Sequence, residues 1–280
     1  MRRLLSANFA RLMKGKLFWT LEAACGALSI IWYILAAQNT RNIGLRWMQG
    51  NANYYFFLIN IYIGVFLAIF ASLFIGTEYA DGTIRNKLSV GHFRRDIYLA
   101  NLTVTAAVGL IFTLTHFAAA VLVGMPLAGA AAVTAIAPPV WRLGETALVV
   151  LVYAALFTLL AMADTNRARV AVIALLLSLA LALGGLAVYG KLHQPELTTR
   201  MVMQEDGSFL REENIPNPAY VSGAAREILT WFKAFLPSSQ ALQIANRDGT
   251  LEIRAPFCLA GTAVLLTFCG VKLFVKKDIQ

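Results

Sequence analysis

The chain lacks the short motifs that mark most nucleotide-binding and metal-dependent enzymes. It contains no G-x-x-x-x-G-K-[ST] loop with which to hold the phosphates of ATP, and no H-E-x-x-H zinc motif. Its three histidines, His92, His116 and His193, are far apart in the sequence. We therefore predict that this chain has no catalytic residues, no metal site and no cofactor of its own.

Cysteine and charge are also scarce. The three cysteines, Cys25, Cys258 and Cys269, all lie in apolar runs, so they predict neither a disulfide framework nor a metal site. Only 14% of the residues are charged and 59% are hydrophobic, which excludes an ordinary soluble domain. The net charge of +9 does not predict a nucleic-acid partner, because the basic residues flank apolar runs instead of forming one soluble face.

Six apolar runs are each long enough to cross a bilayer as a helix. They cover residues 17–37, 54–75, 99–125, 143–163, 170–190 and 255–275. The first run is too long for the apolar part of a typical secretory signal, so we interpret it as an uncleaved span. The sequence predicts an all-α integral membrane protein with six transmembrane helices in a single domain, residues 1–280, surrounded by membrane lipid.

The distribution of Lys and Arg predicts the orientation of these spans. The N-terminal segment, the segments after the second and fourth runs, and the tail hold five, four, two and two of them, thirteen in all. The opposite short segments hold three, Arg41, Arg46 and Arg142. Because basic residues concentrate on the cytoplasmic side, we expect both termini in the cytoplasm and the long loop 191–253 outside.

Residues 1–16 predict an amphipathic helix that lies on the membrane surface. Leu5, Phe9, Leu12 and Met13 recur at helical spacing among five basic residues. Since the first apolar run follows directly, we expect this helix to meet the membrane at an elbow.

A polar segment, residues 76–98, separates the second and third runs. Asp81-Gly82 predicts a turn, Thr83 a helix N-cap and Gly91 a helix end, which leaves a helix of about two turns between them. Ile84 and Leu88 share one face of this helix, giving an apolar stripe suited to docking on a soluble partner. Glu78 and Arg85 are close enough in sequence to pair across the turn.

The string G-T-E-Y-x-x-G-T-I-R-N-K-L, residues 76–88, resembles the cytoplasmic segment after the second span in permeases of type 2 ATP-binding-cassette (ABC) exporters. The opening RRLLSANFARLMKGKLFW, the outer segment LPSSQALQI and the tail FVKKDI are similar to the same family. The resemblance implies that residues 76–98 carry a coupling helix, which docks on a separate ATPase subunit that binds ATP and magnesium. The coupling residues implied are Glu78, Thr83, Ile84, Arg85, Asn86, Lys87 and Leu88.

The resemblance also implies alternating access between two six-span halves in a bacterial cell membrane. One chain supplies half of the pathway, so a second permease chain, identical or a paralogue, is expected. The substrate is expected to be a peptide, a drug-like or a lipid-like compound. Two alternatives stay open: an ion- or proton-coupled secondary carrier that uses Glu22, and a membrane sensor without flux.

Acidic residues mark two further candidate sites. Glu22 lies inside the first run, where a carboxylate needs a partner or water, so we expect it to line the translocation path, bond a neighbouring helix or reach the headgroups. The outer loop 191–253 is mildly acidic, and it forms either a contact for cationic peptides or a hydrated surface. Its acidic cluster consists of Glu205, Asp206, Glu212 and Glu213. Residues 225–244 predict interfacial or re-entrant helices broken at Pro237.

Overall fold

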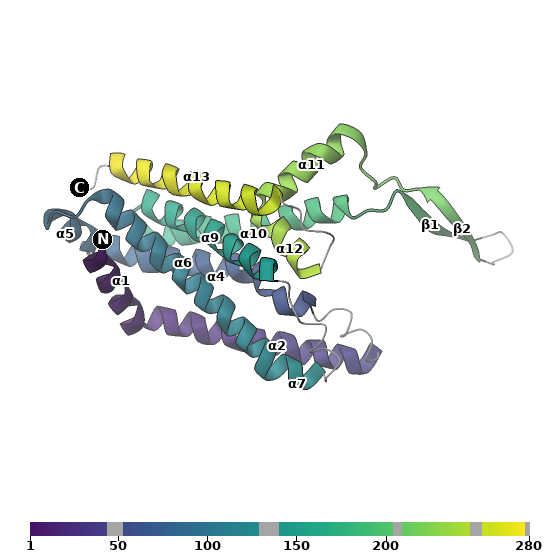
Figure 1. The fold of residues 1–280 in the computed structure, drawn as a ribbon, viewed down its shortest axis with the longest axis horizontal. Coiled ribbons are helices and arrows are strands. Elements are labelled where there is room, and N and C mark those ends of the chain that lie inside the picture. The colour runs from purple at the N-terminus through teal and green to yellow at the C-terminus, as the bar shows by residue number, and fades with distance from the viewer. Residues whose placement is uncertain (44–52, 129–139, 204–208, 247–253, 278–280) are drawn as a thin grey trace.

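A computed structural model describes residues 1–43, 53–128, 140–203, 209–246 and 254–277 (Figure 1). Within these residues, six helices are long and apolar enough to cross a membrane. They are Lys16–Gln38, Asn53–Ala80, Arg94–Leu127, Trp141–Ala163, Arg167–Leu192 and Arg254–Lys276. The predicted all-α fold with six spans is confirmed, because each apolar run has become one of these helices.

The bounds of the helices and strands are α1 Arg2–Lys14, α2 Lys16–Ile43, α4 Ile59–Ala80, α5 Thr83–Ser89, α6 Arg94–Ala119, the π-helix η1 Ala120–Gly124, α7 Met125–Ala128, α9 Val140–Ala163, α10 Arg167–Leu192, β1 Leu197–Met203, β2 Phe209–Pro216, α11 Gly223–Phe235, α12 Pro237–Asn246 and α13 Arg254–Lys276. The continuous helix α6–η1–α7 supplies the third span.

Helices α4 and α9 form the centre of the bundle and bury most of their side chains, whereas α2, α10 and α13 bury only a minority of theirs. The exposed surface of the outer helices is apolar, as expected for helices that face lipid. Small residues bring the central helices together: a Cβ on Gly109 of α6 would lie 2.6 Å from Val150 Cγ1 of α9. Such close approach is how membrane helices gain packing energy, since burial from lipid adds no hydrophobic driving force.

The two ends of the bundle differ (Figure 1). Both termini and α5 lie at one end, which we call the terminal end, and the β1–β2 hairpin projects from the other, the hairpin end. Six membrane crossings, an even number, return the chain to the side on which it began, which agrees with both termini lying at one end. At the terminal end, Gly15 interrupts the first helix: it has an extended backbone between α1 and α2.

The long loop contains strands that the sequence analysis did not predict. β1 and β2 pair antiparallel, with Leu197 opposite Pro216 and Val202 opposite Leu210. After the hairpin, α11 ends at Phe235 and α12 begins at Pro237. α12 is buried against α10, where the Ser239 hydroxyl donates to the Gly185 carbonyl at 3.3 Å.

Candidate functional site

Helix α5 connects α4 to α6 at the terminal end, and glycines set both of its ends. Gly82 occupies the N-cap position with a φ of 64°, the left-handed region that glycine tolerates best. Thr83 is the first helical residue, so the prediction that its side chain caps the helix is wrong. At the other end Gly91 has a φ of 90°, and the His92 amide donates to the Lys87 carbonyl at 3.1 Å. The predicted end at Gly91 is confirmed.

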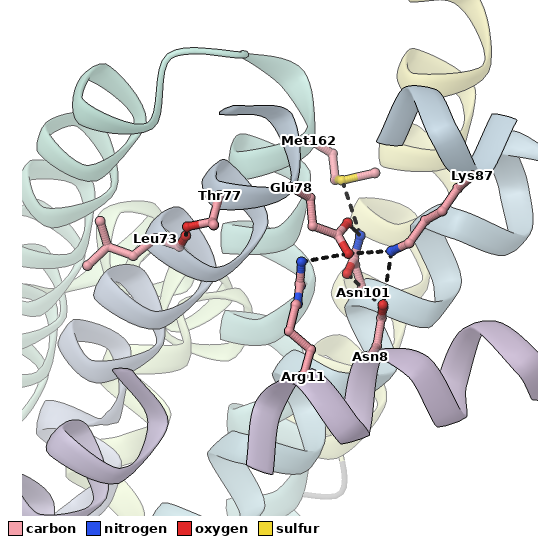
Figure 2. A network of polar contacts seen from close by, with 8 residues as sticks. All are labelled: Asn8, Arg11, Leu73, Thr77, Glu78, Lys87, Asn101 and Met162. Atoms are coloured by element: carbon pink, nitrogen blue, oxygen red, sulfur yellow. Dashed lines mark hydrogen bonds and ion pairs between the residues drawn. The ribbon is translucent and has the colours of Figure 1, made fainter. Parts of the chain in front are cut away.

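A carboxylate with no exposed surface lies beside α5. Glu78, near the end of α4, has a side chain that is 0% exposed. Arg11 Nη1 of α1 lies 2.9 Å from Glu78 Oε1, and Lys87 Nζ of α5 bonds the same oxygen. Asn101 of α6 donates through Nδ2 to Glu78 Oε2 at 2.9 Å. One buried carboxylate therefore holds side chains from three other helices (Figure 2).

Asn8 closes this cluster from the side of α1 (Figure 2). Its Nδ2 donates to Asn101 Oδ1 at 2.9 Å, and its Oδ1 accepts from Lys87 Nζ at 2.9 Å. Met162 Sδ, at the end of α9, lies 3.8 Å from Asn101 Nδ2. We call Asn8, Arg11, Glu78, Lys87 and Asn101 the Glu78 cluster; it ties α5 to α1, α4 and α6.

The predicted pairing of Glu78 with Arg85 is wrong. Arg85 is exposed, and Glu78 pairs with Arg11 and Lys87 instead. The reason is helical geometry: Lys87 lies three residues after the buried Ile84 and so shares its inward face, whereas Arg85 lies about 100° around the helix from it.

The same geometry corrects the expected docking face. Ile84 is 1% exposed and belongs to the bundle's own core, and Leu88 packs against that core, so their stripe faces inward. The exposed surface here carries Arg85, Val90 and Phe93, and the two apolar side chains are 78% and 77% exposed. Exposed apolar side chains of this size beside a basic residue are typical of a protein-binding surface.

Burial and charge act against each other in the Glu78 cluster. Burial lowers the pKa values of Arg11 and Lys87 from their ordinary values, and the Glu78 carboxylate raises both again. Arg11 also stacks on the Phe74 ring, with its guanidinium carbon 3.8 Å from the ring centre. The carboxylate therefore offsets part of the cost of burying two cations inside the protein.

The C-terminal tail is fastened to the same end. Lys277 Nζ lies 3.1 Å from the Tyr79 hydroxyl and 3.1 Å from the Met162 carbonyl. Arg94, at the start of α6, donates to the Phe274 carbonyl at 3.3 Å and to that of Lys277. The first and last helices are thus both tied to the segment that contains α5.

A comparison with known protein families shows which family the chain belongs to. The family model described as "ABC-2 family transporter protein" matches residues 4–187, which include most of α1, all of α5 and the whole Glu78 cluster. The chain belongs to the ABC-2 transporter family. It is thus the multi-pass, non-catalytic permease component of an ABC transporter, a class that works with an ABC ATPase subunit. No curated protein matches the chain.

The predicted path residue of this ABC-2 permease, Glu22, lies on α2 and faces α6. The Thr115 hydroxyl donates to Glu22 Oε1, so the carboxylate bonds a neighbouring helix. Its other oxygen, Oε2, is buried and has no hydrogen-bond partner among the described residues.

Two turns further along α2, a polar group that sequence analysis missed joins three helices of the permease. His116 of α6 is fully buried, and its Nδ1 lies 2.8 Å from the Tyr62 hydroxyl and 2.9 Å from that of Ser29. Its Nε2 lies 3.0 Å from the Tyr55 carbonyl, which assigns the proton to Nε2. The sequence did contain a signal for this group. Glu22 and Ser29 are seven residues apart, so they lie on the same face of α2, and His116 is a polar residue within an apolar run.

Of the four acidic residues predicted to contact substrate in the outer loop, the structure describes two. Glu205 and Asp206 lie outside the described residues. Glu212 and Glu213 are exposed on β2, and Glu213 pairs with Arg211 at 3.0 Å. Within the described part of the permease, no group of three His, Cys, Asp or Glu side chains could hold a metal ion.

Proposed function

We propose that this permease is the membrane subunit of an ATP-driven exporter in a bacterial cell membrane, with both termini and α5 in the cytoplasm. The excess of Lys and Arg in the segments at the terminal end supports this orientation. ATP and Mg²⁺ are bound by the separate ATPase chain.

The observation that carries the proposal is the Glu78 cluster. A coupling helix has to pass a displacement of the ATPase to the membrane helices, and it does so only if it is joined firmly to them. Lys87 joins α5 to Glu78 of α4 and to Asn8 of α1, and Asn101 extends the connection to α6. A displacement of α5 therefore moves three helices together, the mechanical property that coupling needs.

The ATPase docks on the exposed side of α5 and the turn after it. Val90 and Phe93 supply the apolar contact and Arg85 the charged one. Of the coupling residues implied by the family resemblance, Glu78, Ile84, Lys87 and Leu88 act from inside by holding the helix in place. Thr83, Arg85 and Asn86 remain at or near the surface that meets the partner.

The chain forms half of a translocation pathway, completed by a second permease chain, identical or a paralogue. Its substrate is a peptide, a drug-like or a lipid-like compound. The exposed carboxylates of Glu212 and Glu213 at the hairpin end favour a cationic peptide.

The test is co-purification of the ATPase from native membranes in mild detergent. Val90→Glu with Phe93→Glu places two charges on the docking surface without touching the core, so the ATPase should be lost while the thermal stability of the permease stays unchanged. Leu197→Glu is the matched control, because it places a charge on a 49% exposed apolar side chain at the hairpin end; it should retain the ATPase. Full retention by the double variant, or no ATPase with the wild type, would contradict the proposal.

A second candidate function rests on Glu22. A buried carboxylate oxygen without a partner among the described residues is the feature expected of a proton-coupled carrier. That function predicts transport that persists without ATP, collapses with the proton gradient and is lost in Glu22→Gln. Transport that needs ATP and survives Glu22→Gln excludes it.

A further inference from the structure

A groove of about 550 Å³ opens between α6, α9 and α13. Its walls are almost entirely apolar; the side chains that matter here are Leu99, Leu102, Leu151, Val264 and Phe268. All three helices are long and apolar enough to span a membrane, so the groove lies in the membrane-spanning part of the bundle. The volume lies in the range of specific small-molecule sites.

Positive charge is confined to one end of the groove. Arg95, the second residue of α6, lines it and is exposed. Lys272 of α13 is also exposed, and its Nζ lies 4.4 Å from the centre of the Phe268 ring, which lines the groove. Both cations lie toward the terminal end, since α6 begins there and α13 ends there.

The neighbouring charges are already engaged, whereas Arg95 is not. Arg94 donates to carbonyls of the C-terminal tail, and Asp96 lies 3.6 Å from the amino group of Met1. Among the residues that the structure describes, Arg95 has no ion pair. A guanidinium at the mouth of an apolar groove in a membrane is complementary to a phosphate that carries an acyl chain.

The dimensions agree with this chemistry. Lys272 lies four residues before the end of α13, about 6 Å inside it, from where a lysine reaches the headgroups by extending its side chain. From Arg95 to Leu102 the apolar wall extends for about 10 Å along α6.

We propose that this groove binds one phospholipid with an anionic headgroup from the leaflet at the terminal end. The phosphate lies against Arg95 and Lys272, and an acyl chain lies along Leu99, Leu102 and Phe268. This lipid is a resident ligand, distinct from the transported substrate, and the proposal does not depend on the docking of an ATPase.

The test is native mass spectrometry of the delipidated full-length chain, titrated with phosphatidylglycerol or phosphatidylcholine of the same acyl chains. Each basic residue near a headgroup contributes about a five-fold preference, so two predict that the first phosphatidylglycerol binds on the order of 20-fold more tightly than phosphatidylcholine. Arg95→Gln with Lys272→Gln should abolish the preference. Arg200→Gln with Arg211→Gln removes the same charge from exposed positions on the β1–β2 hairpin, which projects from the opposite end of the bundle, and should preserve it.

A second variant tests the groove itself. Val264→Trp fills the groove from a side chain that is 69% exposed, so folding is preserved and retention of the first lipid should fall at least ten-fold. Equal binding of both lipids by the wild type, or an unchanged preference in the Arg95 and Lys272 variant, would overturn the proposal. So would a Val264→Trp protein that keeps its lipid but loses a dimer, because a second copy of the chain would then occupy the groove.

Discussion

Replacing Glu78 with glutamine removes one charge and almost no volume from the Glu78 cluster. The side chain is 0% exposed and shares one oxygen between Arg11 and Lys87. In the variant these two cations remain at the same place without the carboxylate. Burial already lowers their pKa values, and Glu78 is the first opposing cause for each. The variant therefore leaves two cations, both largely shielded from water, without the carboxylate that they share.

The expected cost follows from the burial of each partner. Removing one member of a buried ion pair costs about 3–5 kcal/mol, because the other charge is left unpaired. Arg11 is 31% exposed and can turn toward water, whereas Lys87 is 12% exposed. We therefore expect the lower end of the range, a loss of about 3 kcal/mol in the free energy of unfolding.

Reversible unfolding in mixed detergent micelles measures this loss. Glu78→Gln combined with Lys87→Met also removes the less exposed of the two cations and leaves only Arg11 charged, so it should recover more than half of the stability lost in the single variant. Arg85→Gln is the control: Arg85 is exposed, so its replacement should change the free energy of unfolding by less than about 0.5 kcal/mol. A loss below about 1 kcal/mol in Glu78→Gln would refute the reasoning, as would an Arg85 variant that is equally destabilised.

Three further predictions concern the same end of the bundle. Ile84→Ala should lower the free energy of unfolding by about 2–4 kcal/mol, since Ile84 is 1% exposed within the core; chemical unfolding measures it. Gly76→Ala should cost about 1–3 kcal/mol in the same measurement, because its Cβ would lie 3.1 Å from Arg167 Cα. Arg169→Gln should raise the pKa of Asp164 from about 2 toward the ordinary 3.8, since Arg169 is the main cause of the lowered value; carboxyl-carbon NMR follows this titration.

The two stability predictions have matched controls, and the third has a defined pH dependence. Val90→Ala, at a side chain that is 78% exposed, should leave the free energy of unfolding unchanged. Gly144→Ala adds a methyl group where nothing lies within 4 Å, so it should not destabilise α9. The pKa of Asp164 is lowered in the folded protein, so its stabilising contribution is complete above about pH 4 and is lost as the pH falls toward 2. A wild-type Asp164 that titrates near 3.8 would contradict the pairing.

The spans were predictable because a bilayer imposes one requirement on every helix: about twenty apolar residues that satisfy their own backbone hydrogen bonds. The end of α5 was predictable for a similarly local reason, since a glycine there adopts a positive φ. The β1–β2 hairpin was not predictable in this way. Its strands are short and lie in a polar loop, and they are strands because they form hydrogen bonds with each other.

The partners of Glu78 could not be read from its neighbourhood in the sequence. Arg11 precedes it by 67 residues, and the choice of Lys87 over Arg85 depends on which face of α5 is buried. On α1, Leu4, Asn8 and Leu12 are the buried residues. Asn8 lies four residues from each of these leucines, so the sequence places a polar side chain on the same face as two apolar ones. This spacing could have predicted a buried polar contact. The sequence analysis instead assigned the apolar face to Leu5 and Phe9.

The way in which both termini are fastened bears on how the protein should be handled. The Met1 amino group lies 3.6 Å from Asp96, and Lys277 reaches the Tyr79 hydroxyl. An affinity tag at either terminus therefore starts beside the surface of α5 and would compete with whatever binds there. The β1–β2 hairpin projects from the opposite end (Figure 1), so a tag placed on it leaves α5 accessible.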